Sequence, residues 1–416
     1  MGVQTLCEKI ATLHRRRGPV RPLRAGDVVS LRPRHLLTHD NTAAVIDRFG
    51  LTGARTVRSP WQALITLDHD VQNTDPEQLA VWRRIEEFAR RQRLEFRPCG
   101  SGVGHQIMVE EGFVVPGSLC VAADSHANMY GALGALGTPV VRSDAMAIWA
   151  TGEFWWEVPR SVRVRLQGSL AEGVTGKDLN LARCARYRDG EVHGAVVEFE
   201  GPGAEALSMD DRFTISNMTT EWGAIGGVFP VDATTIEYLE WVRRELVKRG
   251  QRRFTKAQIG AWATAPLVAD PEAVYAATIT VDLATVTPTL TGPASPAAMA
   301  PAESTVAVDK AFLVGCANAR LGDLAAAARV VRGQKVHPRV KFYVAAASRR
   351  IQDDAVRSGV WQTLLDAGAR TLPPGCAMCI GLGEGILEAG EVAVSATNRN
   401  YPGRMGHVDA QAWLAS

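Results

Sequence analysis

The sequence predicts a protein of the α/β class. Strand-length apolar segments alternate with amphipathic segments of helical period along most of the 416 residues. Two apolar segments in the N-terminal part lead directly into clusters of ionisable residues, as strands with a ligand site at their carboxyl ends do. Hydrophobic residues make up 46% of the chain and charged residues 22%, which is typical of folded globular proteins. The length is enough for two or three domains.

The first predicted domain covers residues 1–158. Within it, Gln78–Arg91 carries apolar residues at helical spacing and is predicted to be an amphipathic helix. Residues 63–67 and 118–123 are mostly apolar and are predicted to be buried strands. The two strands lead into Asp68-His69-Asp70 and Asp124-Ser125-His126. Because ligands collect at the carboxyl ends of strands in open α/β sheets, we expect a site there.

The chain beyond residue 158 is predicted to form two more domains, 159–285 and 286–416. The second domain begins with residues 161–166, which alternate like a half-exposed strand, and 196–199 is similar. Residues 285–304 are rich in proline, alanine and threonine and are predicted to be a linker or an extended crossing segment. In the third domain we predict three strands, at 311–314, 340–344 and 392–395. We also predict two helices there, at 321–332 and 360–367.

Charge and cysteine content exclude several classes of protein. The net charge of +2 argues against a nucleic-acid binder, and no run of about 18 apolar residues predicts a membrane span. We therefore expect neither nucleic acid nor a membrane as a partner. The N-terminus lacks the layout of a secretory signal, and the seven cysteines are too thinly spread for a disulfide scaffold. The expected location is the cytoplasm, where cysteines stay reduced.

Three cysteines in the C-terminal part form a candidate metal site. Cys376 and Cys379 are a Cys-x-x-Cys pair, and Cys316 follows a predicted strand further upstream. The pair alone fits a redox site or half of a zinc site, and Cys316 alone fits a buried structural residue. A shared iron–sulfur site is the third interpretation, and three thiolates would leave one coordination position open for substrate. The spacing leaves these alternatives open.

The ionisable clusters of the first domain suggest acid–base chemistry. Asp68 beside His69 can orient an imidazole and favour its charged form, as a general acid requires. His105 follows two glycines that let the backbone approach a ligand closely. Asp124-Ser125-His126 adds a third group. A Ser-His-Asp hydrolase is a competing interpretation, but Ser125 lacks the Gly-x-Ser-x-Gly turn.

Two further polar groups are candidates for substrate contacts. Asn217 and Glu221 are four residues apart, so on a helix they would share one face; a helix cap or a surface pair is the alternative. Asn398 and Arg399 follow a predicted strand, and Arg404 comes after a Pro-Gly turn. Guanidinium groups bind carboxylates with two parallel hydrogen bonds, so the turn suits a di- or tricarboxylate, although a surface turn with ordinary salt bridges has the same sequence.

Together these motifs resemble the large-subunit type of the aconitase superfamily, and within it homoaconitases of the fungal type. The resemblance runs over essentially the whole chain. It implies three α/β/α domains around a 4Fe–4S cluster in which Cys316, Cys376 and Cys379 bind three irons and one iron has no protein ligand. It also implies that the swivelling fourth domain, which carries the serine base, is lacking here and belongs to a separate small subunit.

The resemblance implies a role for each candidate residue. His69, oriented by Asp68, would protonate the departing hydroxyl group. The remaining catalytic residues would surround the water or hydroxide at the open iron position: His105, Asp124, His126 and Glu221. The substrate-binding residues would include two arginines that clamp carboxylates: Ser125, Asn217, Asn398, Arg399 and Arg404.

The implied activity is that of a hydro-lyase that hydrates cis-homoaconitate to homoisocitrate in lysine biosynthesis of the 2-aminoadipate type. A 3-isopropylmalate dehydratase large subunit or a specialised isomerase on a related tricarboxylate is the alternative within the family. A cluster-dependent RNA-binding regulator is the alternative from another class. The chain departs from the family at Ala317, where threonine is usual, and at Ala377 and Met378 in the usual Cys-Gly-x-Cys. These changes leave the three cysteines intact but alter their surroundings.

Overall fold

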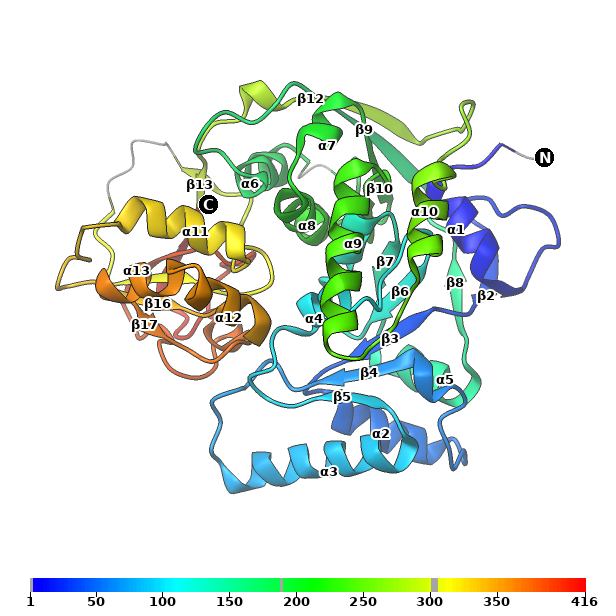
Figure 1. Ribbon diagram of the computed structural model, residues 1–416, viewed down its shortest axis with the longest axis horizontal. Helices are drawn as coiled ribbons and strands as arrows, with labels where there is room; N and C mark the ends of the chain where they lie inside the picture. The colour runs from blue at the N-terminus through cyan, green and yellow to red at the C-terminus, as the bar shows by residue number, and fades with distance from the viewer. Residues whose placement is uncertain (1–2, 188–189, 301–305) are drawn as a thin grey trace.

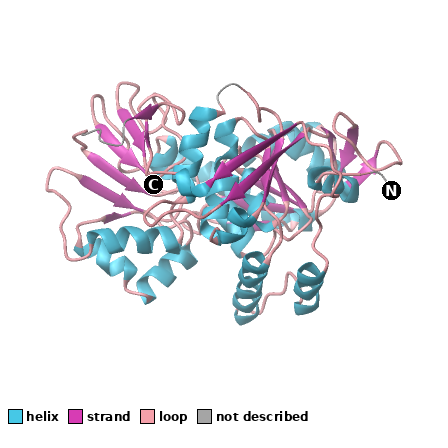
Figure 2. Cartoon of the chain, turned by 90° about the horizontal axis from the view of Figure 1, so that it is seen from above, coloured by secondary structure: helices cyan, strands magenta, loops and turns pink. Residues whose placement is uncertain are grey.

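The structure is a computed structural model, and it describes residues 3–187, 190–300 and 306–416. The strands form four sheets, with helices packed around and between them (Figures 1 and 2). No helix within these ranges is both long and apolar enough to cross a membrane. The end of the predicted linker, residues 301–304, lies outside the described residues.

The first large sheet has five parallel strands in the order β5-β4-β3-β6-β7. The strands are short: β3 His35–Thr38, β4 Ala63–Thr66, β5 Glu95–Arg97, β6 Leu119–Ala122 and β7 Leu136–Pro139. The helical elements that connect them are α2 Thr42–Leu51, η1 Pro60–Gln62, α3 Pro76–Gln92, α4 Gly104–Glu110 and η2 Ala127–Leu133. Helix α5 Arg142–Thr151 follows the last strand, β7. Because β4 and β6 flank β3, the segments that follow these three strands meet at one edge of the sheet.

The N-terminal helix α1, Leu6–His14, precedes a small antiparallel sheet made of β1 Arg15–Arg17, β2 Val28–Leu31 and β8 Phe154–Glu157. A capping box begins α1: the Thr5 hydroxyl accepts from the Glu8 N–H, and the Glu8 carboxylate accepts from the Thr5 N–H. Leu6 and Ile10 on this helix are buried in the same core as the first large sheet.

The second large sheet has four parallel strands in the order β11-β10-β9-β12. Its strands are β9 Ser161–Gln167, β10 Val196–Glu200, β11 Gly226–Val228 and β12 Ala277–Asp282. The accompanying helices are α6 Gly176–Arg186, α7 Pro202–Ala206, α8 Met209–Met218, η3 Thr219–Trp222, α9 Ala233–Lys248, α10 Lys256–Thr264 and η4 Leu283–Thr285. Leu239 and Leu246 of α9 form a cluster with Val115 of the first part of the chain.

The third large sheet has seven strands in the order β14-β13-β19-β18-β15-β16-β17. Two of its pairings, β14 with β13 and β13 with β19, are antiparallel, and the others are parallel. The strands are β13 Leu290–Thr291, β14 Met299–Ala300, β15 Lys310–Leu313, β16 Lys341–Val344, β17 Arg370–Thr371, β18 Val392–Ser395 and β19 Gln411–Leu414. Its helical elements are α11 Leu321–Val331, α12 Arg349–Arg357, α13 Val360–Asp366 and η5 Ala377–Ile380.

The predicted α/β class is confirmed. Each predicted helix and strand is present within a few residues of its expected bounds, including α3, β4 and β15. The three predicted domains are kept as a proposal. The core of the first sheet continues into the second through Val196 and Val228, so these two units share apolar contacts. The third unit occupies one side of the molecule in Figure 1, with α11, α12 and α13 on its outer surface.

Candidate active site

Asp68 and His69 follow β4 and form a hydrogen-bonded pair. Oδ1 of Asp68 lies 2.8 Å from Nδ1 of His69, and Oδ2 of Asp68 accepts the N–H of Gly104 at 2.6 Å. Asp68 is buried. The second ring nitrogen of His69, Nε2, points toward Asp124 at 3.5 Å. The carboxylate therefore orients the ring and leaves its other nitrogen directed at the centre of the site.

The surroundings of His69 favour its protonated form. Burial by itself would lower the pKa of His69, but the charges of Asp68 and of the Cys376 thiolate, and the hydrogen bonds to Asp124 and Asp40, raise it well above the usual value. A histidine that holds its proton at neutral pH is suited to act as a general acid.

Asp124 lies at the centre of a group of three histidines. Oδ1 is 2.7 Å from Nε2 of His105 and accepts the backbone N–H of His126 at 2.8 Å, while Oδ2 faces His69. Burial would raise the pKa of Asp124, yet the charge of His105 and hydrogen bonds from the three histidines hold it well below the usual value. Asp124 is therefore ionised and orients all three rings.

A second chain of contacts runs from His126 to Arg399. Nε2 of His126 is 3.1 Å from Oε1 of Glu221, and Nε of Arg399 donates to both oxygens of that carboxylate at 2.9 and 3.1 Å. Nη1 of Arg399 donates to the Ser125 hydroxyl at 2.9 Å. Burial would raise the pKa of Glu221, but the His126 hydrogen bond and the Arg399 charge lower it below the usual value. A fixed guanidinium beside a hydroxyl is suited to bind a carboxylate.

The three predicted cysteines are buried next to this network. Cys316 follows β15, whereas Cys376 directly precedes the short turn η5 and Cys379 lies within it. The N–H of Cys376 donates to the Asp68 carbonyl at 2.7 Å, and the N–H of Ala377 donates to the His69 carbonyl at 2.9 Å. The cysteine turn and the Asp68–His69 segment are thereby held together.

Two asparagine side chains meet at the sulfur of Cys316. Nδ2 of Asn217 donates to Cys316 Sγ at 3.2 Å, and Nδ2 of Asn398 donates to it at 3.4 Å. Amide donors directed at sulfur are typical of the surroundings of iron–sulfur clusters. Burial and the nearby Cys379 raise the pKa of the Cys316 thiol to about 12. Burial thus disfavours the charged thiolate of Cys316 unless a metal compensates it, and three neighbouring cysteines are a donor set that fits a metal group.

The spacing of the sulfur atoms argues against a single zinc ion. One zinc holds each sulfur at about 2.3 Å, so three sulfur ligands would all lie within about 4.6 Å of one another. In the described chain, the three cysteine sulfurs do not form a group within 4.8 Å. A larger inorganic group fits this arrangement better.

One expectation about local structure is wrong. Asn217 and Glu221 do not share the face of one helix, because α8 ends at Met218 and the tighter turn η3 begins at Thr219. The break directs Asn217 toward Cys316 and Glu221 toward His126 and Arg399. Both residues thus lie in the site, but at different parts of it.

Of the predicted site residues, Arg404 is not joined to the others. Its guanidinium carbon lies 5.8 Å from the ring centroid of Tyr401, and its side chain makes no hydrogen bond within the described residues. The other predicted residues belong to the network of contacts above. The substrate-binding role of Arg404 therefore stays a prediction.

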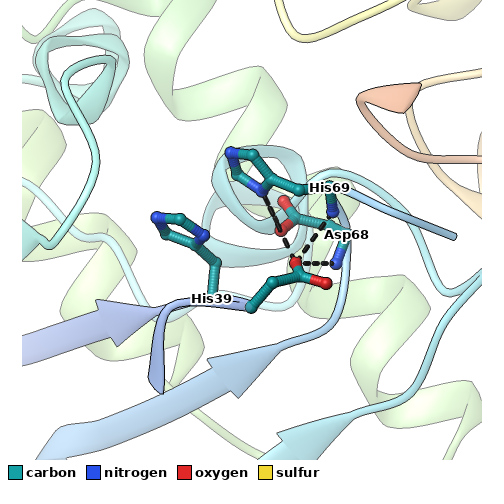
Figure 3. A group of neighbouring side chains, drawn as sticks. His39, Asp68 and His69 are labelled. Atoms are coloured by element: carbon teal, nitrogen blue, oxygen red, sulfur yellow. Dashed lines mark hydrogen bonds and ion pairs between the residues drawn. The ribbon is translucent and has the colours of Figure 1, made fainter. Parts of the chain in front are cut away.

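The sequence reasoning missed His39 and Asp40, which follow β3. Oδ2 of Asp40 accepts the backbone N–H groups of Asp68 and His69 at 3.0 and 2.9 Å. The His39 ring stacks on the His69 ring with centroids 4.0 Å apart (Figure 3). A signal was present, because an apolar strand followed by an ionisable pair has the same form as the segments ending at Asp68 and Asp124.

Comparison with known proteins identifies the relatives of this chain. The aconitase family (aconitate hydratase) matches residues 8–307 and 300–416. The mitochondrial homoaconitase of Cryptococcus neoformans var. neoformans serotype D is 48% identical over 415 residues, which cover 95% of this chain and 57% of that protein. The corresponding protein of Mycosarcoma maydis is 47% identical, covering 100% of this chain and 59% of the relative. The homoaconitase of Candida parapsilosis is 48% identical, covering 99% of this chain and 61% of the relative. The chain thus spans about three fifths of these relatives.

A solved structure supports the fold. Aconitase X from Thermococcus kodakaraensis, in its holo form, superposes with a TM-score of 0.53 at 13% sequence identity. The match covers 92% of this chain and 88% of that one. At this identity the likeness concerns the arrangement of helices and sheets alone.

The relatives overturn two expectations. A separate small subunit is contradicted, because each matched homoaconitase is a single longer chain and carries the remaining length in the same polypeptide. A cytoplasmic location is contradicted by the same proteins, which are mitochondrial. Thinly spread cysteines argue against a disulfide scaffold but do not distinguish the cytosol from other reducing compartments. The resemblance of the motifs to the aconitase superfamily is confirmed over nearly the whole length, and the chain belongs to the aconitase family.

Proposed function

We propose that this chain carries the cysteine site, the acid group and the carboxylate-binding arginine of a hydro-lyase of the homoaconitase type, which hydrates cis-homoaconitate to homoisocitrate. The observation that carries the proposal is the continuous network from the three buried cysteines, through Asp68 and His69, to Asp124 and Arg399. The similarity to homoaconitases over nearly all of this chain supports the choice of substrate.

The proposed cofactor is a 4Fe–4S cluster held by Cys316, Cys376 and Cys379, with one iron free of protein ligands. When bound, such a cluster supplies a Lewis acid at its open iron, which polarises a hydroxyl or carboxylate oxygen. Asn217 and Asn398 would hydrogen-bond the Cys316 thiolate and tune the potential of the site.

The residues around the open side of the site have distinct proposed tasks. His69 holds a proton at Nε2 and delivers it to the departing hydroxyl, and in the hydration direction the same atom takes the proton back. Asp124 keeps the rings of His105 and His126 in position around the reacting water. Arg399 and Ser125 bind a substrate carboxylate, and Glu221 fixes the guanidinium for that contact.

The test uses the protein reconstituted anaerobically with iron and sulfide. Disappearance of the alkene absorbance is followed with cis-homoaconitate and cis-aconitate, and its appearance is followed with isopropylmalate, which forms an alkene on dehydration. We expect the highest kcat/KM with cis-homoaconitate, and loss of bound iron and of activity in Cys376→Ser. Cys99→Ser is the matched control, because Cys99 is a half-buried thiol outside the site. Activity that survives Cys376→Ser contradicts the cluster, and preference for another substrate contradicts the homoaconitase assignment.

A further inference from the structure

A cavity of about 540 Å³ lies at the opposite edge of the first large sheet from the candidate active site. Arg34 directly precedes β3, Trp61 lies in η1 before β4, and Ser118 directly precedes β6. The active-site residues follow the same strands at their carboxyl ends. Strands of four residues separate the two edges by about 13 Å, so the cavity is a separate place on the molecule.

Four arginines line this cavity and no carboxylate does: Arg15, Arg16, Arg32 and Arg34. The chain as a whole is nearly neutral, with 46 basic and 44 acidic residues, so this is a local concentration of positive charge. Within the described residues, none of the four forms an ion pair with aspartate or glutamate. Neighbouring arginines outside the cavity are paired, as Arg17 is with Glu153 at 3.6 Å.

Arg15 donates to the carbonyls of Pro19, Val20 and Arg21, but the other three arginine side chains are at most partly satisfied by the protein. Arg32 donates to the Ser59 hydroxyl at 3.1 Å and stacks on Trp61, but its Nε is buried without a partner. The Nε of Arg34 is also buried without a partner, and the Arg34 side chain makes no hydrogen bond within the described part of the chain. Buried N–H donors without acceptors are uncommon in folded proteins, and an anion would supply the missing acceptors.

Two tryptophans add aromatic surface to the wall. Trp61 and Trp262 both line the cavity, and Trp262 comes from α10, which lies next to α1 in Figure 1. His14 holds the end of α1 in place, because Nδ1 donates to the Arg32 carbonyl at 2.9 Å and Nε2 accepts the Leu119 N–H at 3.0 Å. Both nitrogens of His14 are thereby used, so the charge of the cavity comes from the arginines.

We propose that this cavity binds a phosphorylated small molecule, with a nucleoside triphosphate as the best match. Guanidinium forks bind phosphate oxygens in pairs, and Arg16, Arg32 and Arg34, with the added charge of Arg15, suit the high negative charge of a triphosphate. The tryptophans provide surfaces against which a base can pack. The volume lies within the usual range for small-molecule sites. The site is distinct from the binding of substrate at Arg399.

The test is calorimetric titration of the protein with ATP, GTP and pyrophosphate at fixed, low ionic strength. We expect ATP or GTP to bind more tightly than pyrophosphate, and Arg34→Gln to weaken binding about tenfold or more. Arg16 is exposed, so its replacement does not disturb folding, and Arg16→Gln should also weaken nucleotide binding. Arg17→Gln is the matched control and should leave binding unchanged, because Arg17 is paired with Glu153 outside the cavity.

Two further results bear on the nature of the ligand. Trp61→Ala should weaken nucleotide binding and leave pyrophosphate binding intact. Equal affinity for pyrophosphate and nucleotides contradicts the nucleoside part of the proposal. Binding that is unchanged in Arg34→Gln and Arg16→Gln, or that is displaced by cis-homoaconitate, overturns the site and places the anion at Arg399 instead.

Discussion

At the scale of single residues, the contact between Asp68 and His69 determines how strongly the site holds a proton. The Asp68 carboxylate is among the groups that raise the pKa of His69 above its usual value. An uncharged amide of the same shape at this position retains much of the packing but removes the charge. Comparing aspartate with asparagine at this position therefore separates the electrostatic role of Asp68 from its structural role.

We predict that Asp68→Asn lowers kcat by roughly 10²–10⁴-fold. The lost carboxylate lowers the pKa of His69, so the imidazole loses its proton at lower pH. In the dehydration direction the alkaline limb of the pH–rate profile should therefore move to lower pH. Asp70→Asn is the control, because Asp70 bonds to Asn73 rather than to His69. A profile that does not move would show that Asp68 does not set the proton affinity of His69.

Ala377 is a residue in a backbone conformation that favours glycine. Its φ is +40°, one of two non-glycine residues with positive φ in the described chain. Alanine in the left-handed region costs about 1 kcal/mol or more. The family's usual glycine at this position avoids that cost, and the conformation is retained here because the Ala377 N–H bonds to the His69 carbonyl.

We predict that Ala377→Gly raises the free energy of unfolding by about 1 kcal/mol. Urea denaturation of the apo protein measures the change. Ala355→Gly in α12 is the control with the opposite sign, since glycine in a helix interior lowers stability by about 1 kcal/mol. A lower stability for Ala377→Gly would mean that the backbone at this position carries no strain.

At the scale of elements, Glu198 fastens α1 to the second sheet. This buried carboxylate on β10 accepts the N–H groups of Leu6 at 3.1 Å and Cys7 at 2.9 Å. It also accepts the hydroxyls of Ser161 at 2.9 Å and Tyr275 at 2.8 Å. A negative charge at a helix N-terminus is favourable, and here it satisfies two of the free N–H groups.

We predict that Glu198→Ala lowers the free energy of unfolding by about 3 kcal/mol, because several buried donors lose their acceptor. The free energy of unfolding of Glu198→Gln should lie between those of the parent protein and Glu198→Ala, since the amide oxygen still accepts hydrogen bonds. Glu200→Gln, on the same strand and paired with Arg165 at the surface, should change stability by less than about 1 kcal/mol. Equal effects of Glu198→Ala and Glu200→Gln in denaturant unfolding would contradict this role.

At the scale of the whole molecule, a buried neutral histidine links folding to pH. His35 on β3 packs edge-on against Phe113 and Trp61, with ring centroids 5.2 and 6.1 Å away. Burial, assisted by the charge of Arg34, lowers the pKa of His35 to about 3. The unfolded chain binds a proton at this residue near the ordinary pKa of about 6.5, whereas the folded chain does not.

We therefore predict that His35 contributes a loss of stability as pH falls. The contribution is fully favourable above pH 6.5 and declines by about 1.4 kcal/mol per pH unit toward pH 3. His35→Phe keeps the aromatic packing. It should reduce the loss of unfolding free energy that the parent protein shows between pH 7 and pH 5. His337 is exposed, so His337→Gln should leave the pH dependence of the unfolding free energy unchanged. The idea fails if the two variants and the parent show the same slope.

The sequence identified much of the site because its signals are local. Asp68, His69 and Asp124 stand directly after apolar strands, and parallel strands bring such positions to one edge. His39 and Asp40 follow the same rule and were missed, although only the structure shows that Asp40 receives two N–H groups from the neighbouring strand's end. Arg404 was predicted from its spacing to Arg399, but a turn does not determine where each side chain points.

What the sequence determined by itself is the α/β class, the aconitase-type motifs and the three cysteines, because each depends on residues close together in the chain. Only the tertiary structure decided which groups meet. Asn217 of α8 and Asn398, which follows β18, converge on Cys316, and the break between α8 and η3 directs Glu221 away from Asn217 toward Arg399. Such contacts depend on the order of strands in the sheets and on where helices end. These features place side chains to within a few ångströms, and no local sequence pattern specifies them.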